Sequence, residues 1–358
     1  MSALAVYITG HGFGHATRVA AVLKALRARL PHVRLLLRTT APRSVFEGYL
    51  GGAFEYEPVA LDCGVGELDI LRSDIAWTRR AWREFLPHEE ELAGREAEFL
   101  RREGVGAVYF DLPPLAAEVA ARAGIPSAGV SNFSWDYIFA DFARHDPFFG
   151  ELAEHFARQY EMTTVALELP LGHALTAFPR RRPIPLVANR SHADRAEIRR
   201  QLGLRPGQRA VLVALRQARL PGLDATSLPE GTQLLGFGEF EGPGVLQLPP
   251  QFMGRFTDLL AASDAVLSKP GYGVASECIA NQVPLLHLPR MDFAETAPLL
   301  EQLSRLIPQR GMTVEELEEG RLGRCLEDLF ALADGWQWQE VDCSGAETAA
   351  QVLHEYLV

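Results

Sequence analysis

The chain has few of the features that mark secreted, membrane-spanning or zinc-binding proteins. Its four cysteines, Cys63, Cys278, Cys325 and Cys343, are far apart and form no C-x-x-C pair, so they indicate neither a disulfide framework nor a zinc site. No apolar run approaches the roughly 20 residues that span a bilayer. The first residues also lack the basic and then apolar pattern of a secretion signal. The sequence therefore predicts a cytoplasmic protein and leaves peripheral membrane contact open.

Lysine is scarce as well, since Lys24 and Lys269 are the only two. The net charge of −11 argues against a nucleic-acid partner, because such a protein needs a basic surface to displace counterions. A local basic pocket for a phosphorylated small molecule is compatible with that charge. The 358 residues are enough for about two domains.

Short apolar segments alternate with helical patterns along most of the chain. Strands that are apolar throughout indicate parallel sheets covered by helices on both faces. In the first half, the expected strands are 3–9, 33–40, 105–111 and 126–132, and the expected helices are 16–30 and 115–124. In the second half, the expected strands are 209–217, 231–237, 244–250, 264–269 and 284–290, and the expected helices are 256–263, 272–282 and 346–357.

A stretch rich in Pro and Arg, residues 169–192, shows no clear period and separates the two halves. The pattern predicts an α/β protein with two Rossmann-like domains that face a central cleft. We expect an N-terminal domain over 1–180, a C-terminal domain over 181–342, and a closing helix within 343–358.

The first glycine-rich loop lies in "TGHGFGHATR", between an expected strand and an expected helix. Gly10, Gly12 and Gly14 occupy alternate positions, and His15 stands where a dinucleotide fingerprint has its third glycine. The second strand carries Arg38 instead of an acidic residue that would hold a ribose. This loop therefore argues against an NAD site, and an NADP site is only slightly more compatible.

His15 is expected at or just before the helix N-terminus. The positive end of the helix dipole disfavours imidazolium, which keeps the ring able to accept a proton. The alternative is a ring that caps the helix. Asp111 ends the expected strand 105–111, where it can fix the tautomer of a histidine or cap a turn. His11 either shapes the loop or touches substrate.

The stretch "SDAVLSKPGYGVASECIANQVPLLHLPRMDFAET" (263–296) repeats this arrangement in the second half. A strand ends at Lys269, a turn with Gly271 and Gly273 follows, and a helix opens before Glu277. Backbone amides at such a helix start bind a diphosphate, and glycines permit its close approach. Glu277 can accept hydrogen bonds from ribose hydroxyls, or it can only complement the helix dipole.

This order of strand, glycine turn, Ser-Glu and "PLLHLPRMD" resembles the donor-nucleotide motif of GT-B glycosyltransferases, of which MurG-like and UDP-glycosyltransferase enzymes are the nearest types. The stretches "TGHGFGHATR", "LDCG" (61–64) and "SNFSWDYIF" (131–139) resemble the glycosyltransferase-like N-terminal region of plant L-arabinokinases and its free-standing bacterial relatives. The resemblance covers most of the chain and is weak over 140–205. No galactokinase-type domain follows in this sequence, so sugar kinase activity is not implied.

The resemblance implies a GT-B fold with the acceptor bound by the first domain and the nucleotide sugar by the second. By position it implies an acceptor-activating base, His15, and its orienting carboxylate, Asp111. The expected donor contacts are Arg216, Gly271, Gly273, Ser276 and Glu277 for the nucleotide, and Asp292 and Glu295 for the sugar. The expected acceptor or loop residues are His11, Gly12, Gly14, Asn132, Trp135 and Asp136.

The sequence departs from the family at the first turn of the second half. Relatives carry a Gly-Gly pair beside the diphosphate, whereas this chain has Leu215 and Arg216. Either Arg216 or Arg219 supplies charge in place of backbone amides, or the phosphate site is altered. Trp135 and Tyr137 either stack on a sugar or fill the wall of the cleft.

Together these features predict an inverting glycosyltransferase with a nucleotide diphosphate sugar as donor, and UDP is the favoured nucleotide. The chain has no D-x-D pair, so we expect no metal and no cofactor. The linker is expected to act as a hinge for domain closure. One alternative is a nucleotide-sugar epimerase or hydrolase on the same fold, and another is a non-catalytic nucleotide-sugar-binding protein.

Overall fold

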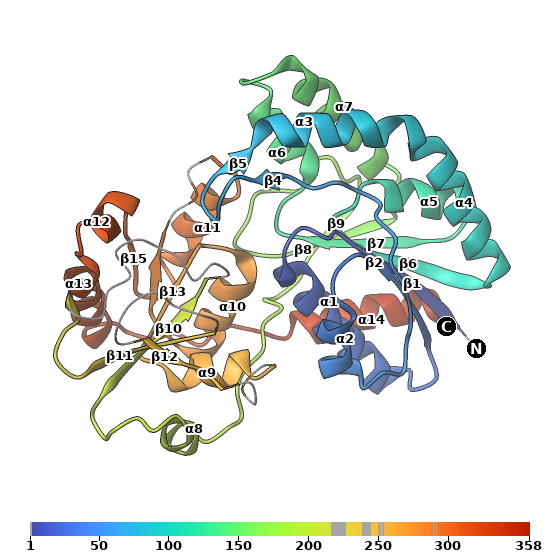
Figure 1. The fold of residues 1–358 in the computed structure, drawn as a ribbon. Helices are drawn as coiled ribbons and strands as arrows, with labels where there is room; N and C mark the ends of the chain where they lie inside the picture. Colours follow the sequence, from blue (N-terminus) through green and yellow to red (C-terminus); the bar gives the residue numbers. More distant parts are fainter. Residues whose placement is uncertain are drawn as a thin grey trace.

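The computed structural model describes residues 2–215, 227–237, 245–249, 252, 254–288, 290 and 292–358. Figure 1 shows two α/β lobes, and each is built on a parallel sheet with helices packed against it. The arrangement confirms the expected alternation of apolar strands and helices in both halves.

The first sheet has the strand order β3-β2-β1-β6-β7-β8-β9, and all of its neighbouring strands are parallel. Both faces of the inner strand β1 are covered, which explains why its residues 4–7 have no exposed surface. The strands are β1 (Ala3–Ile8), β2 (Arg34–Thr39), β3 (Glu55–Glu57), β6 (Val105–Asp111), β7 (Ser127–Ser131), β8 (Val165–Glu168) and β9 (Arg181–Pro183).

Helices cover both faces of this sheet, and an antiparallel hairpin of two short strands extends from it. The helices are α1 (Phe13–Arg29), α2 (Arg43–Leu50), α3 (Ile75–Phe85), the 3-10 helix η1 (Leu86–His88), α4 (Glu89–Arg102), α5 (Leu115–Ala123), α6 (Trp135–Phe142) and α7 (Pro147–Tyr160). The hairpin strands are β4 (Gly66–Glu67) and β5 (Ser73–Asp74).

The second sheet has the order β12-β11-β10-β13-β14-β15 in the described residues and is also parallel throughout. Its strands are β10 (Arg209–Ala214), β11 (Thr232–Gly236), β12 (Val245–Gln247), β13 (Ala265–Ser268), β14 (Leu285–His287) and β15 (Gln309–Gly311). The helices of this half are α8 (Arg195–Gln201), α9 (Phe256–Ala262), α10 (Tyr272–Asn281), α11 (Thr296–Leu303), α12 (Val314–Glu318) and α13 (Leu322–Asp334). Within the ranges described, no helix is both long and apolar enough to cross a membrane.

The aperiodic stretch 169–192 connects the two lobes, as expected, but part of it forms β9. This strand pairs with β8 through its backbone, and its side chains are exposed. The sequence therefore has no apolar pattern that would predict it. Pro183 is tolerated because β9 is the edge strand. The structure does not test the domain boundaries of 180/181 and 342/343, which stay predictions.

The last helix, α14 (Gly345–Leu357), returns from the second lobe and packs against α1 and β6 of the first. Figure 1 shows it in red beside the dark blue α1. The hydroxyl of Ser2 donates to the carbonyl oxygen of Leu357 at 2.6 Å. The two ends of the chain therefore meet on the first lobe.

Candidate active site

The first glycine-rich loop joins β1 to α1 at the carboxyl edge of the first sheet. Gly12 precedes the helix with a φ of +88°, a conformation that L side chains rarely adopt. This turn lets α1 begin at Phe13, three residues earlier than the expected start at 16. His15 consequently lies in the first turn of the helix.

The predicted pairing of His15 with Asp111 is present in the structure. Nδ1 of His15 lies 2.8 Å from Oδ1 of Asp111, because β1 and β6 are neighbours and Asp111 ends β6 opposite Ile8. Burial alone would raise the pKa of Asp111, but Arg18 and His15 beside it hold that pKa below its usual range. Asp111 is therefore an ionised carboxylate with no exposed surface.

Arg18, which is not among the expected site residues, completes this cluster. Its Nε donates to Oδ2 of Asp111 at 2.5 Å and its Nη2 donates to Oδ1 at 2.7 Å. Nη2 also lies 3.3 Å from Oγ of Ser131, to which it donates, and 2.9 Å from Nδ1 of His15. The available signal was its spacing of three residues from His15, which places both side chains on one face of α1.

These distances favour one tautomer of His15. A guanidinium can only donate hydrogen bonds. If Nη2 of Arg18 donated to Nδ1 of His15, the lone pair of the ring would be used there, and Nδ1 would have no proton for the Asp111 oxygen 2.8 Å away. A proton on Nδ1 instead donates to Asp111, while Nη2 has Asp111 and Ser131 as acceptors. Nε2 then keeps a lone pair that can accept a proton.

His11 and Trp135 belong to an aromatic wall beside the loop. The His11 ring packs edge-on against Trp135 with centroids 5.6 Å apart and is stacked on Phe293 at 6.2 Å. Trp135 has no exposed surface, so of the two alternatives for this residue the structure has it filling the wall. Tyr137 is stacked instead on His173, with ring centroids 3.6 Å apart.

The motif "LDCG", for which the sequence offered no account beyond a turn, places a buried carboxylate behind this wall. Oδ1 of Asp62 accepts from Oγ1 of Thr9 and Oδ2 accepts from Nε1 of Trp135, both at 2.9 Å. Burial raises the pKa of Asp62 to about 6, although both hydrogen bonds and the nearby His15 oppose that rise. Asp62 is thus a second acidic group close to His15.

Asn132 and Asp136 were expected to contact the acceptor, but both are largely enclosed. Oδ1 of Asn132 accepts from Nη1 of Arg18, and Nδ2 donates to Oε1 of Glu295, each at 2.8 Å. Asn132 therefore links the first half to a residue expected at the donor sugar. Oδ1 of Asp136 is buried and has no hydrogen-bond partner within the described part of the chain, and burial raises the pKa of this carboxyl.

The second glycine-rich loop joins β13 to α10, and it touches the first loop. A Cβ built on Gly273 would lie 3.5 Å from Cα of Gly14, so the two helix starts approach each other through glycines. Gly271 precedes α10 in an extended conformation. Ser276 is buried, and its hydroxyl donates to the carbonyl oxygen of Gly273 at 3.0 Å, so it is bonded within its own helix.

Glu277 lies in the second turn of α10 and is held by neutral groups. Oε1 accepts from Nδ2 of Asn189 at 3.0 Å, and Oε2 accepts from Oγ1 of Thr257 at 2.8 Å. The same Nδ2 donates to the hydroxyl of Tyr49 at 2.9 Å. Burial raises the pKa of Glu277, and these two hydrogen bonds partly offset the rise. Asn189 and Thr257 carried no signal in the sequence, because only the fold brings them to this carboxylate.

Asp292 also contacts the first half of the chain. Its Oδ2 accepts from the backbone amide of Ser73 at 2.5 Å. Beside it, Oε1 of Glu67 accepts from Nζ of Lys269 and from Nη1 of Arg290, each at 3.0 Å. The β4–β5 hairpin is thus anchored to the carboxyl ends of β13 and β14. Arg216 and Arg219, the candidate substitutes for the Gly-Gly pair, lie outside the described residues.

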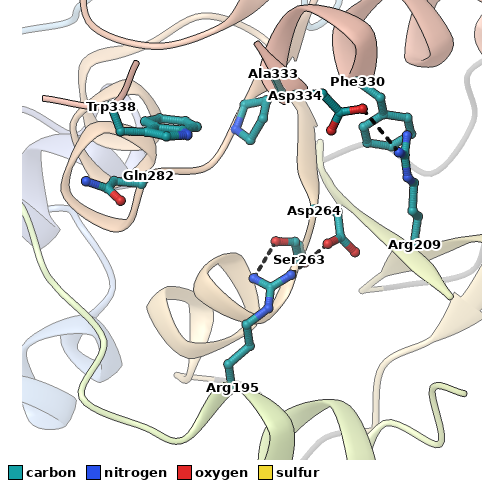
Figure 2. A pocket seen from close by; sticks show the side chains of 10 residues that line it. Arg195, Arg209, Ser263, Asp264, Gln282, Phe330, Ala333, Asp334 and Trp338 are labelled. Carbon is teal, nitrogen blue, oxygen red and sulfur yellow. Dashed lines mark hydrogen bonds and ion pairs between the residues drawn. The ribbon is translucent and has the colours of Figure 1, made fainter. Parts of the chain in front are cut away.

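Two hollows differ in their position relative to the sheets. One of about 400 Å³ is lined by Gly10, Gly12, Phe13, Ala41 and Pro42, at the carboxyl ends of β1 and β2. The other, of about 300 Å³, lies at the amino ends of β10 and β13, and Figure 2 shows that its Arg195 and Arg209 are paired with Ser263, Asp264 and Asp334. Ligands of open α/β sheets bind at carboxyl ends, which favours the first hollow.

Arg38 offers no contact for the phosphate of an NADP. Its guanidinium donates to both oxygens of Glu96, at 2.5 and 2.9 Å, and Glu96 is almost completely buried. In the ranges that the structure covers, no group of three or more His, Cys, Asp or Glu side chains is arranged to hold a metal ion.

The fold is that of GT-B glycosyltransferases. CalG4, the calicheamicin glycosyltransferase, matches with a TM-score of 0.61 and 16% identity over 100% of this chain and 98% of its own. UGT2 of Phytolacca americana, solved with UDP-2-fluoroglucose and pterostilbene, matches with a TM-score of 0.61 and 15% identity over 99% and 100%. A Listeria monocytogenes protein described as a UDP-N-acetylglucosamine 2-epimerase matches with a TM-score of 0.56 and 14% identity over 99% and 94%.

In sequence, the chain is a homologue of the L-arabinokinase of Arabidopsis thaliana. The two are 33% identical over 366 residues, which cover 98% of this chain and 34% of the plant protein. The chain therefore spans about a third of the length of that relative. No protein-family model matches the chain.

Proposed function

We propose that this protein is a glycosyltransferase that moves a sugar from a nucleotide diphosphate sugar, with UDP favoured, to an acceptor hydroxyl with inversion. The observation that carries the proposal is the contact between Gly14 and Gly273. It brings the start of α1, which carries His15, against the start of α10, a helix start suited to a diphosphate. Two loops that serve the two substrates of one displacement have to meet in this way.

In the proposed reaction, Nε2 of His15 takes the proton of the acceptor hydroxyl, and Asp111 holds the ring in position from Nδ1. The acceptor oxygen attacks the anomeric carbon as the bond from that carbon to the diphosphate breaks. The negative charge that develops on the leaving diphosphate is stabilised by the backbone amides at the start of α10. A single displacement of this kind inverts the anomeric centre.

The substrates are assigned to the two halves by the position of these groups. The hollow lined by Gly12 and Phe13 lies at the turn that precedes His15 in the chain, and Phe13 is 45% exposed, which suits an acceptor with an apolar face. Gly271 and Gly273 are the proposed contacts of the donor diphosphate, and Glu277 is the proposed contact of its ribose. Asp292 and Glu295 remain the proposed contacts of the donor sugar. The sugar hydroxyls would compete with Ser73 for Asp292 and with Asn132 for Glu295.

A screen of nucleoside diphosphates by thermal shift tests the donor, because a ligand that binds the native state raises the melting temperature. We expect UDP to give a larger shift than GDP, ADP or dTDP. Turnover of the matching nucleotide sugars is then measured with and without acceptor alcohols. Release of nucleotide that depends on the acceptor supports transfer. Epimerisation or hydrolysis of the nucleotide sugar without any acceptor would contradict transfer and support the epimerase or hydrolase alternative. The Listeria monocytogenes protein has a similar fold and is described as an epimerase.

A further inference from the structure

Arg18 is buried beside His15 and Asp111, although a His-Asp pair can form without a neighbouring arginine. It is 5% exposed, and its guanidinium donates to both oxygens of Asp111. Such a two-point contact fixes the plane of a carboxylate, which a single-point contact leaves free to rotate. Oδ1 of Asp111 is thereby aimed at Nδ1 of His15, 2.8 Å away.

The charge of Arg18 acts on the same pair. An ionised carboxylate next to a histidine stabilises imidazolium, and a ring that is already protonated cannot serve as a base. Arg18 cancels the charge of Asp111 and places its own Nη2 2.9 Å from Nδ1 of His15, where a second positive charge is repelled.

We propose that Arg18 is the positioning residue of this site: it orients Asp111 toward His15 and, by neutralising that carboxylate, keeps the His15 ring uncharged and ready to accept a proton. This inference rests on the proposed function in so far as His15 is the base. Arg18 is then a third member of the His15-Asp111 group, and its separate role is to balance the charge of Asp111.

Other groups around the cluster also contribute to the balance of charge between Arg18 and Asp111. Asp62 lies close enough to His15 and Asp111 for their charges to act on its carboxyl group. From the second half, Tyr272 lies under the guanidinium, with 5.2 Å from Cζ of Arg18 to the ring centroid, and Glu295 acts on Arg18 electrostatically and through Asn132. Arg18 therefore connects residues of the second half to the His15-Asp111 pair.

The experiment measures the charge state of the His15 ring by ¹⁵N NMR on histidine-labelled protein, together with the pH profile of kcat. In the wild type we expect a neutral ring with its proton on Nδ1 at pH 7.5. In Arg18→Gln the imidazolium form should appear at that pH, kcat should fall by about 10- to 100-fold, and the rate should recover as the pH is raised. The KM for the donor should stay within about twofold. Arg18→Lys keeps the charge but not the two-point contact, so its ring should stay neutral while kcat falls.

Arg38→Gln is the matched control, since Arg38 makes an equivalent buried two-point contact with Glu96 in the same half of the chain. It should lower the melting temperature without changing the His15 signals or the pH profile. The double variant Arg18→Gln/Asp111→Asn removes both charges and should restore a neutral ring.

Two results would overturn the inference. One is an imidazolium ring in the wild type at pH 7.5, which decides the matter even if a variant does not fold. The other is an Arg18→Gln protein whose ring and pH profile match those of Arg38→Gln. The NMR measurement needs no substrate, so absence of transfer in the wild type would remove the proposed function and leave the charge balance to be judged by itself.

Discussion

The two glycine-rich loops share one local architecture and differ in the charges that they bury. In the first half, the helix after the loop presents His15 to an ionised Asp111 that is itself neutralised by Arg18. In the second half, the helix presents Glu277 to two neutral donors, Asn189 and Thr257, and among the residues that the structure describes no cation offsets its burial. The strand, glycine turn and helix therefore only position a side chain at the end of the sheet. The buried groups around that side chain determine its charge and its possible chemical role.

The largest expected effect comes from removing the base of the first loop. His15→Ala should lower kcat by about 10²- to 10⁴-fold, because the acceptor then loses its proton without a general base. Donor affinity, measured by calorimetry with UDP, should change by less than about twofold. His32→Ala, at an exposed loop position, is the control and should keep full activity. A catalytically normal His15→Ala would rule out the first loop as the acceptor side.

The buried carboxylate behind the first loop predicts a dependence of stability on pH. The pKa of Asp62 in the folded protein is about 6, above the value of about 3.9 for an unfolded chain. The native state therefore binds this proton more tightly, so the stability that it provides is full below pH 4 and is lost as the pH rises through 6.

Asp62→Asn removes this titration while an amide can still pair with Thr9 and Trp135. At pH 7 we expect the variant to exceed the wild type in free energy of unfolding by as much as about 3 kcal/mol, and at pH 4 the difference should vanish. Urea unfolding at a series of pH values measures both. Parallel curves for the two proteins would show that Asp62 does not titrate in this range.

Substitutions of Glu277, in the helix that follows the second loop, should weaken the binding of UDP and not slow the chemical step. Glu277→Ala removes the proposed acceptor of hydrogen bonds from ribose hydroxyls, and a hydrogen bond to a charged group contributes about 1.5–3 kcal/mol, so UDP should bind roughly 10- to 100-fold more weakly. Glu277→Gln keeps one acceptor oxygen and should bind UDP with intermediate affinity. Glu301→Ala, on the exposed face of α11, should bind UDP as the wild type does. Equal affinities in all four proteins would remove Glu277 from the donor site.

The smallest effect is expected from metal chelation. The chain lacks a D-x-D pair, and the helix start proposed for the diphosphate supplies positive potential without a cation. EDTA should therefore leave the rate of transfer unchanged. A rate that collapses with EDTA and returns with manganese would mean that the second loop requires a metal ion.

The pattern of the sequence predicts the scaffold well because it depends on local periodicity. The strand 105–111 has the predicted bounds, the helix at 272–282 ends one residue early, and the contact of His15 with Asp111 follows from adjacent strands. The short strands β3, β8, β9 and β15 were not predicted. The side chains of β9 are exposed, so its pairing with β8, and not an apolar pattern, creates it.

The partners of the site are harder to predict, because they come from distant parts of the chain. Asp62 meets Trp135 across 73 residues and Asn189 meets Glu277 across 88. Neither spacing carries a periodic signal, since only the packing of separate elements creates such contacts. Arg18 is the exception, since its three-residue separation from His15 could have indicated a shared role.

Whether the two glycine-rich loops serve one reaction is best decided by a structure of the protein bound to a non-transferable UDP-sugar. We expect the diphosphate at the start of α10, a ribose hydroxyl within hydrogen-bond distance of Glu277, and the anomeric carbon on the side of Nε2 of His15 with room for one acceptor oxygen between them. A nucleotide found in the hollow of Figure 2, or turned so that its sugar points away from His15, would contradict this expectation.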